Sequence, residues 1–156
     1  MDIRQLLFEA IGALIACIGF AAIYRNKKRR IFFCGLAAML TWISCAIASY
    51  LTGNDLFMSY MIAAAIGTII SEVLARVLKA PATVFLITAI LPLVPGGSLY
   101  HATFNLVTKN YSNAKLYGTE TAVCALGIAV GLILVSVAFN LWREINQRFI
   151  LKKLNS

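Results

Sequence analysis

The chain is poor in charged residues and in the motifs of catalysis. Only 13% of its 156 residues are charged, six of them acidic, and a single histidine is present. No Walker loop, nucleophile elbow or HExxH motif occurs, and the four cysteines lack the CxxC spacing of metal sites. These absences argue against ATP hydrolysis and metallo-catalysis, so we expect no enzyme activity, no metal and no cofactor.

Apolar residues are abundant instead. They make up 61% of the sequence, and the mean hydropathy is +0.85. Too little polar sequence is left for a separate soluble domain, so we predict one all-helical transmembrane domain over residues 1–156. The cysteines stand singly within apolar stretches, where we expect buried packing thiols: Cys17, Cys34, Cys45 and Cys124.

Five stretches are long enough to cross a bilayer as helices, namely residues 6–24, 31–51, 56–78, 82–107 and 119–142. Residues 109–118 are expected to be a short polar connection outside. The ends of the first, third and fifth spans lie on one side of the membrane. Eleven Lys and Arg residues lie on that side: Arg25, Lys27, Lys28, Arg29, Arg30, Arg76, Lys79, Arg143, Arg148, Lys152 and Lys153. Only Arg4, Lys109 and Lys115 lie outside.

This bias predicts the N-terminus outside and the C-terminus in the cytoplasm, for a multi-pass protein of the inner (plasma) membrane. The net charge of +8 does not indicate nucleic-acid binding, because the basic residues lie between apolar stretches rather than interleaving with aromatics along a polar face.

The fourth span is interrupted by Ile-Leu-Pro-Leu-Val-Pro-Gly-Gly-Ser-Leu at residues 90–99. Pro92 and Pro95 lack the N–H groups that would reach the carbonyls of Thr88 and Leu91. An unpaired backbone group is costly in hydrocarbon, so such a break needs a lining of protein or water. The sequence therefore predicts a broken helix, which is typical of transporter binding sites.

Ionisable side chains within the spans are functional candidates by default. His101 is a candidate for proton coupling, since imidazole titrates near neutral pH, or else a packing residue. Glu72 precedes Arg76 by four residues, so we expect an ion pair, with either a structural or a gating role. Asn105 is placed at the outer exit or in an interhelical hydrogen bond. Two further carboxylates are expected to be structural, Glu9 and, in the first turn of the last span, Glu120.

Small residues recur every four positions in three spans. This spacing lets helix backbones approach closely, so we expect these faces to contact other helices, of this chain or of a second subunit. The residues are Ala37, Thr41, Cys45 and Ser49 in the second span, Ala63, Gly67, Ser71 and Ala75 in the third, and Gly127 and Gly131 in the fifth.

One pattern of residues covers most of the chain: Gly19-Phe20, Cys34-Gly35-Leu36, Trp42, Gly67-Thr68, Arg76, Pro81, Pro92-Leu-Val-Pro95-Gly96-Gly97 and Tyr100. It resembles the threonine/serine exporter (ThrE) family, in its small-subunit form. The resemblance implies secondary export of small hydroxy amino acids, or of small carboxylates such as succinate in some relatives. It also implies a larger partner subunit, whose five-span unit would be inverted relative to this one. The alternatives are a homo-oligomer and a non-transporting accessory or scaffold subunit.

At the break, two helix ends of opposite polarity would meet. With Ser98 as a possible N-cap, the open amides of Ser98, Leu99 and Tyr100 would receive a carboxylate, and the carbonyls of Thr88 and Leu91 an ammonium group or a coupling cation. Thr88 or Tyr100 would bind a side-chain hydroxyl. A packed kink is the alternative. The candidate substrate-binding residues are Thr88, Leu91, Pro92, Pro95, Gly96, Gly97, Ser98 and Tyr100.

Overall fold

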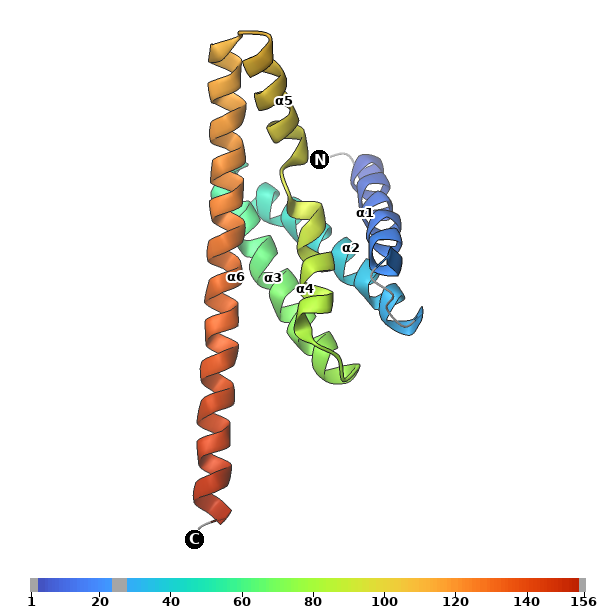
Figure 1. Cartoon of the computed structure of the whole chain (residues 1–156), viewed down its shortest axis with the longest axis vertical. Helices are drawn as coiled ribbons and strands as arrows, with labels where there is room; N and C mark the ends of the chain where they lie inside the picture. Colours follow the sequence, from blue (N-terminus) through green and yellow to red (C-terminus); the bar gives the residue numbers. More distant parts are fainter. Residues whose placement is uncertain (1–2, 24–27, 155–156) are drawn as a thin grey trace.

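A computed structural model describes the backbone of residues 3–23 and 28–154, and the side chains of residue 4 and of residues 6–23 and 29–146. This part of the chain is helical and contains no strand. Its elements in chain order are α1 (Ile3–Ile23), α2 (Lys28–Leu51), α3 (Leu56–Val77), α4 (Ala82–Ile90), the 3₁₀ helix η1 (Leu91–Leu93), α5 (Gly96–Val107) and α6 (Tyr111–Leu154) (Figure 1).

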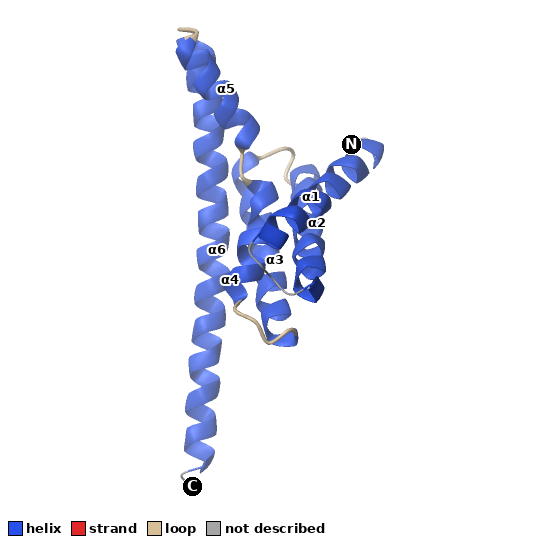
Figure 2. Cartoon of the chain, turned by 45° about the vertical axis from the view of Figure 1, so that its right-hand side comes forward, coloured by secondary structure: helices blue, strands red, loops and turns tan. Residues whose placement is uncertain are grey.

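The helices form a body and an arm. α1, α2, α3 and α4 make the body, and α6 runs past it on one side (Figures 1 and 2). α5 packs on the N-terminal part of α6, beyond the body, and the two form the arm. With 44 residues α6 is about 66 Å long, twice the thickness of a bilayer's hydrocarbon core of about 30 Å.

Four helices are long and apolar enough to cross a membrane, namely α1, α2, α3 and α6. α4 with η1 and α5 qualify only as a pair, bent by 53°. The first three predicted spans match their helices to within three residues at the described ends. The fifth prediction was too short, because α6 begins at Tyr111 and so absorbs most of the expected polar connection.

The turn between α5 and α6 explains this error. Thr108 is the C-cap of α5, and Lys109 adopts a left-handed conformation with φ of 61°. The chain thereby reverses within three residues, and Asn110 already accepts a hydrogen bond from the amide of Ala114 at 3.0 Å. Packing on α5 supports a helix start that composition alone did not indicate.

Local sequence sets the other turns. Gly53 and Asn54 have φ of 65° and 67°, a left-handed conformation that these two residue types tolerate best. Asp55 then caps α3, because its carboxylate accepts from the amide of Met58 at 2.9 Å. At the far end of α3, Pro81 provides the N-cap position of α4.

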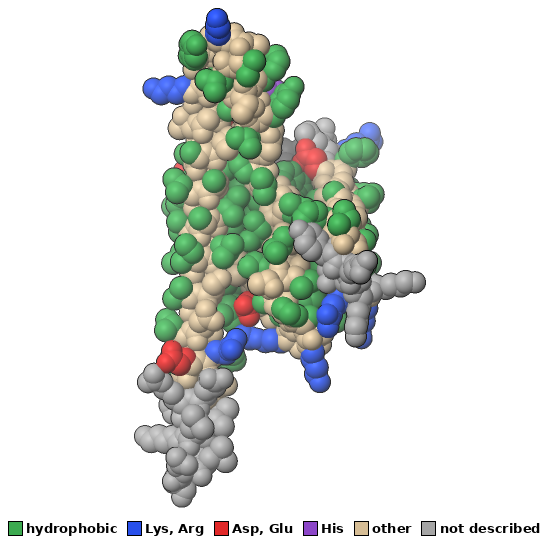
Figure 3. All heavy atoms as spheres, in the orientation of Figure 1, with side chains coloured by type: hydrophobic (Ala, Val, Ile, Leu, Met, Phe, Trp, Pro, Cys, Tyr) green, Lys and Arg blue, Asp and Glu red, His purple; other side chains and the backbone are tan. Residues whose placement is uncertain are grey.

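Basic side chains gather at one end of the body. Nη2 of Arg30 donates to the carbonyl of Lys79 at 3.4 Å, so the start of α2 and the segment that follows α3 meet there. Figure 3 shows the blue Lys and Arg spheres clustered at the lower end of the body, with few at the top. Six of the residues used for the topology prediction lie outside the described side chains, namely Arg25, Lys27, Lys28, Arg148, Lys152 and Lys153.

The small residues of the three stripes lie where α3 packs on α2 and where α6 packs on α3. Ala63, Gly67, Ser71 and Ala75 are all buried in α3, as are Ala37, Thr41 and Cys45 in α2 and Gly127 and Gly131 in α6. A Cβ atom at Gly127 would lie 2.7 Å from the carbonyl oxygen of Phe57. These faces therefore contact helices of this same chain, which the sequence had left open, and the four cysteines are buried as expected.

The largest fully buried side chains belong to α4 and η1. Phe85 and Leu93 are both 0% exposed, whereas α5 has no buried residue. Phe85 packs among small residues of α1, α2 and α3, and Leu93 packs with Cys45 and Ala63. The chain thus leaves the interior of the body between Leu93 and Gly96.

The contact between Thr41 and Gly67 is tight enough to test. A Cβ at Gly67 would lie 2.8 Å from Oγ1 and 3.0 Å from Cγ2 of Thr41, which is fully buried. We expect Gly67→Ala to lower the free energy of unfolding by about 1–3 kcal/mol, and adding Thr41→Ala to restore part of it by removing the clash. Denaturant unfolding in mixed micelles measures both, and strictly additive losses would contradict this packing.

Candidate functional site

The chain between α4 and α5 satisfies several of its own backbone groups. The carbonyl of Leu91, expected to be open, accepts the amide of Val94 at 3.2 Å through the 3₁₀ turn. The hydroxyl of Thr88 donates to the carbonyl of Phe85 at 2.9 Å, and its side chain is only 3% exposed. Of the two carbonyls predicted to receive an ammonium group or cation, those of Thr88 and Leu91, the carbonyl of Leu91 therefore already has a partner.

The N-cap of α5 differs from the prediction by three residues. Pro95, not Ser98, occupies the N-cap position, because the helix begins at the two glycines. The amide of Leu99, expected to be open, donates to the carbonyl of Pro95 at 3.0 Å, and that of Gly96 to Val94 at 2.7 Å.

The open amides of this helix start are therefore those of Gly97 and Ser98, which have no backbone acceptor in the described chain. The space beside the glycines is empty. A Cβ on Gly96 or Gly97 would meet nothing within 4 Å, and both residues are exposed. The start of α5 is thus accessible to a solute.

The arm is joined by polar and aromatic contacts between α5 and α6. Oγ of Ser98 lies 3.4 Å from Oε2 of Glu120, which stands nine residues into α6 rather than in its first turn as predicted. The rings of His101 and Tyr117 are 5.1 Å apart, and Tyr100 packs beside His101 at 5.5 Å. His101 therefore belongs to an aromatic contact between the two helices.

Asn105 donates from Nδ2 to the carbonyl of His101 at 2.7 Å, within its own helix. This bond is intrahelical, not the interhelical bond that was one of the two predicted roles of Asn105. Asn105 and His101 thus both lie on the arm, in α5.

Glu72 and Arg76 form the expected ion pair, with Nη2 and Oε2 3.7 Å apart. The guanidinium also lies over two rings of α6, 4.8 Å from the centre of Phe139 and 5.2 Å from that of Trp142. Phe139 is 19 residues along α6 from Glu120, which is about 28 Å in a helix. The pair is therefore far from the start of α5, and the structure does not bring the predicted candidates into one cluster.

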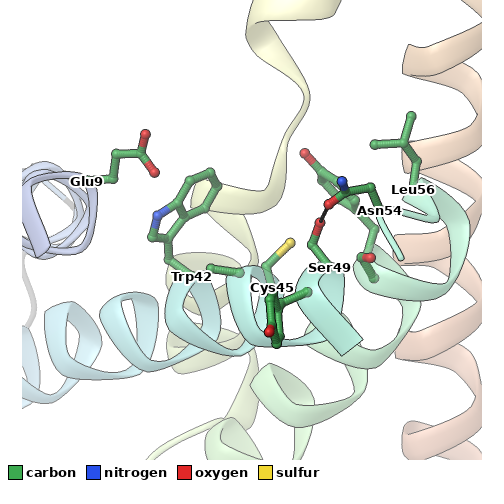
Figure 4. Close-up of a pocket in the computed structure, with 10 residues that line it drawn as sticks. Glu9, Trp42, Cys45, Ser49, Asn54 and Leu56 are labelled. Carbon is green, nitrogen blue, oxygen red and sulfur yellow. Dashed lines mark hydrogen bonds between the residues drawn. The ribbon is translucent and has the colours of Figure 1, made fainter. Parts of the chain in front are cut away.

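A cavity of about 510 Å³ lies beside the bend, between α1, α2 and the start of α3 (Figure 4). Cys45 forms part of its wall and packs with Leu93 of η1, so the cavity adjoins the segment at which the chain leaves the body. The lining residues are Glu9, Trp42, Cys45, Ala46, Ser49, Tyr50, Asn54, Leu56, Ser59 and Tyr60.

The eight residues predicted to bind substrate do not line this cavity, and sequence reasoning missed it. Glu9 was expected to be structural, and Trp42 was used only for the family resemblance. A signal was present, because Trp42, Cys45 and Ser49 follow the i, i+3, i+7 spacing of one helix face. What the sequence did not show is that Glu9 of α1 shares this space.

The described fold is that of an all-helical membrane protein with four or five apolar spans. The family model described as "Threonine/Serine exporter, ThrE" matches residues 9–138, so the chain belongs to the threonine/serine exporter family, a family of transporters. The resemblance seen in the sequence is thereby confirmed.

A protein of Haemophilus influenzae, described as an uncharacterized protein, is 24% identical over 103 residues. The match covers 66% of this chain and 34% of that protein, so the chain spans about a third of its relative's length. No solved structure matches the chain.

Proposed function

We propose that this chain is the small membrane subunit of a secondary exporter of small hydroxy amino acids such as threonine and serine. The observation that carries the proposal is the change of environment at residues 91–98. The fully buried Leu93 is followed within five residues by two exposed glycines and the open amides of Gly97 and Ser98. Membership of the exporter family supports the transport class.

In this proposal α4, η1 and α5 form one broken span, and the amides at the start of α5 receive the substrate carboxylate. The chain then has five spans, with the N-terminus outside and the C-terminus in the cytoplasm of the inner membrane. The cluster of basic residues at one end of the body supports this orientation. Glu72, Arg76, His101 and Asn105 are retained as candidates for proton coupling or gating.

We further propose a larger partner subunit of the same family. Two observations support it: the chain spans about a third of the relative's length, and α5 has no substantial contact with any described helix except α6. A partner would cover the face of α5 that this chain leaves open, where Leu99, Phe104 and Val107 are exposed.

Counterflow into vesicles tests the function. Vesicles that contain this chain with its larger partner should accumulate labelled threonine or serine against an internal unlabelled pool, and vesicles with either chain alone should not. Counterflow of succinate instead would indicate an exporter of small carboxylates. Transport by the small chain alone would indicate a homo-oligomer, and equal transport by the large chain alone would leave this one an accessory or scaffold subunit.

A further inference from the structure

We propose that the cavity between α1, α2 and α3 is a second solute site, which holds a small zwitterion by its ammonium group against Glu9 and by an acceptor oxygen at the indole N–H of Trp42. The proposal rests on the export function above for the identity of the solute. It concerns residues that are separate from the start of α5.

The charge of the lining favours a cation. Glu9 supplies a carboxylate, and no Lys or Arg is among the described residues that line the cavity. A carboxylate accepts several hydrogen bonds at once, and an ammonium group offers three donors. The rings of Trp42, Tyr50 and Tyr60 add faces that attract cations.

The serine hydroxyl groups in the wall of the cavity also bear on which solute group it would hold. Oγ of Ser49 donates to Oδ1 of Asn54 at 3.1 Å, and Oγ of Ser59 donates to the carbonyl of Asp55. Oγ of Ser59 also lies 3.0 Å from Oγ1 of Thr52, so this hydroxyl is held within the protein. Because the hydrogen of Ser49 is used within the protein, its oxygen remains as an acceptor for a ligand. The cavity therefore presents the carboxylate of Glu9 and the oxygen of Ser49 as acceptors for a solute group rich in donors.

Trp42 supplies a donor that the described chain does not satisfy. Its Nε1 is buried and is the one buried side-chain nitrogen or oxygen without a partner among the described residues. Figure 4 shows the nitrogen edge of the indole turned toward α1, and the carboxylate of Glu9 pointing toward Trp42. A buried N–H without an acceptor is destabilising, so a bound carboxylate or hydroxyl oxygen would relieve that cost.

The place of the cavity suggests its role in transport. It lies where α2 turns into α3, with Asn54 and Leu56 in its wall, whereas Arg30 and Lys79 meet at the opposite end of the body. In the proposed orientation this end faces outward. The cavity is then a release site that the solute occupies after it leaves the bend.

Fluorescence of Trp42 tests the site without any transport. With Trp142→Phe, Trp42 is the sole tryptophan of the chain. Titration of the full solubilised chain with L-serine should change its emission saturably. Ethanolamine, which keeps the ammonium and hydroxyl groups, should bind more tightly than glycolate, which lacks the ammonium. Glycolate binding as tight as that of serine, or no response to serine, would overturn the proposal.

Two substitutions assign the partners. Binding of radiolabelled serine should weaken about tenfold in Glu9→Gln, which removes the charge, and severalfold in Trp42→Phe, which keeps the ring but not the donor. Glu144→Gln, in the C-terminal half of α6, is the matched control and should bind normally. Normal binding by both cavity variants would contradict the proposal.

The two proposals fail separately. Saturable binding at Trp42 without counterflow would refute the export function and leave the cavity site. Counterflow without any response at Trp42 would refute the cavity site and leave export.

Discussion

Pro95→Ala combined with Gly96→Ala is expected to lower threonine efflux from loaded vesicles by about tenfold or more, as for a displaced binding group. Alanine at both positions restores an N–H at residue 95 and removes the freedom of the glycine, so the chain can continue as a helix into α5. The amides of Gly97 and Ser98 would then bond within the helix rather than to a solute.

The variant should still fold and assemble. A Cβ at Gly96 meets nothing within 4 Å, and neither Ser98 nor Glu120, which join α5 to α6, is substituted. Pro81→Ala combined with Gly12→Ala is the matched control, because it replaces one proline and one glycine away from the bend. A Cβ at Gly12, like one at Gly96, meets nothing within 4 Å. Normal efflux by the Pro95 variant would show that the bend is a packed kink. Loss of assembly together with efflux would favour an accessory subunit.

Gly131→Ala should lower the free energy of unfolding more than Gly67→Ala does. A Cβ there would collide with the carbonyl oxygen of Met61 and lie 3.1 Å from the backbone nitrogen of Ala65, so the backbones of α3 and α6 would have to separate. We expect a loss of about 3 kcal/mol in the free energy of unfolding, the upper part of the range for overpacked cores. Denaturant unfolding in mixed micelles measures it.

Gly118→Ala provides the control on the same helix. A Cβ at Gly118 meets nothing within 4 Å, so this substitution should raise stability by up to about 1 kcal/mol through helix propensity. If Gly131→Ala were equally harmless, the close approach of α3 and α6 would be wrong. Because α5 packs on α6, the Gly131 variant should also lose efflux as the arm moves away from the body.

Much of the helical pattern was predictable, since it depends on neighbouring residues. Apolar runs gave the first three helices to within three residues, and the two prolines placed the end of α4 and the start of α5 inside residues 90–99. The pair of Glu72 and Arg76 follows from their spacing by four. The N-cap of α5 was missed by three residues because a glycine serves as well as a serine in a first turn, and spacing does not distinguish them.

The candidate site was less predictable. Ser98 was expected to cap a helix, but it contacts Glu120, which lies 22 residues away along the chain. The polar connection predicted before the last span is instead the first two turns of α6. Packing on α5 stabilises a helix there that the polar composition did not predict.

The sequence by itself determined that the chain is all-helical and apolar, that it carries stripes of small residues and to which family it belongs. These properties lie in composition and in residue types a few positions apart. Only the tertiary structure decided that the stripe of α3 packs on that of α2, that the glycines of α6 pack on α3, and that Glu9 and Trp42, 33 positions apart, line one cavity. The physical reason is that such contacts depend on how whole helices pack, which no local pattern encodes.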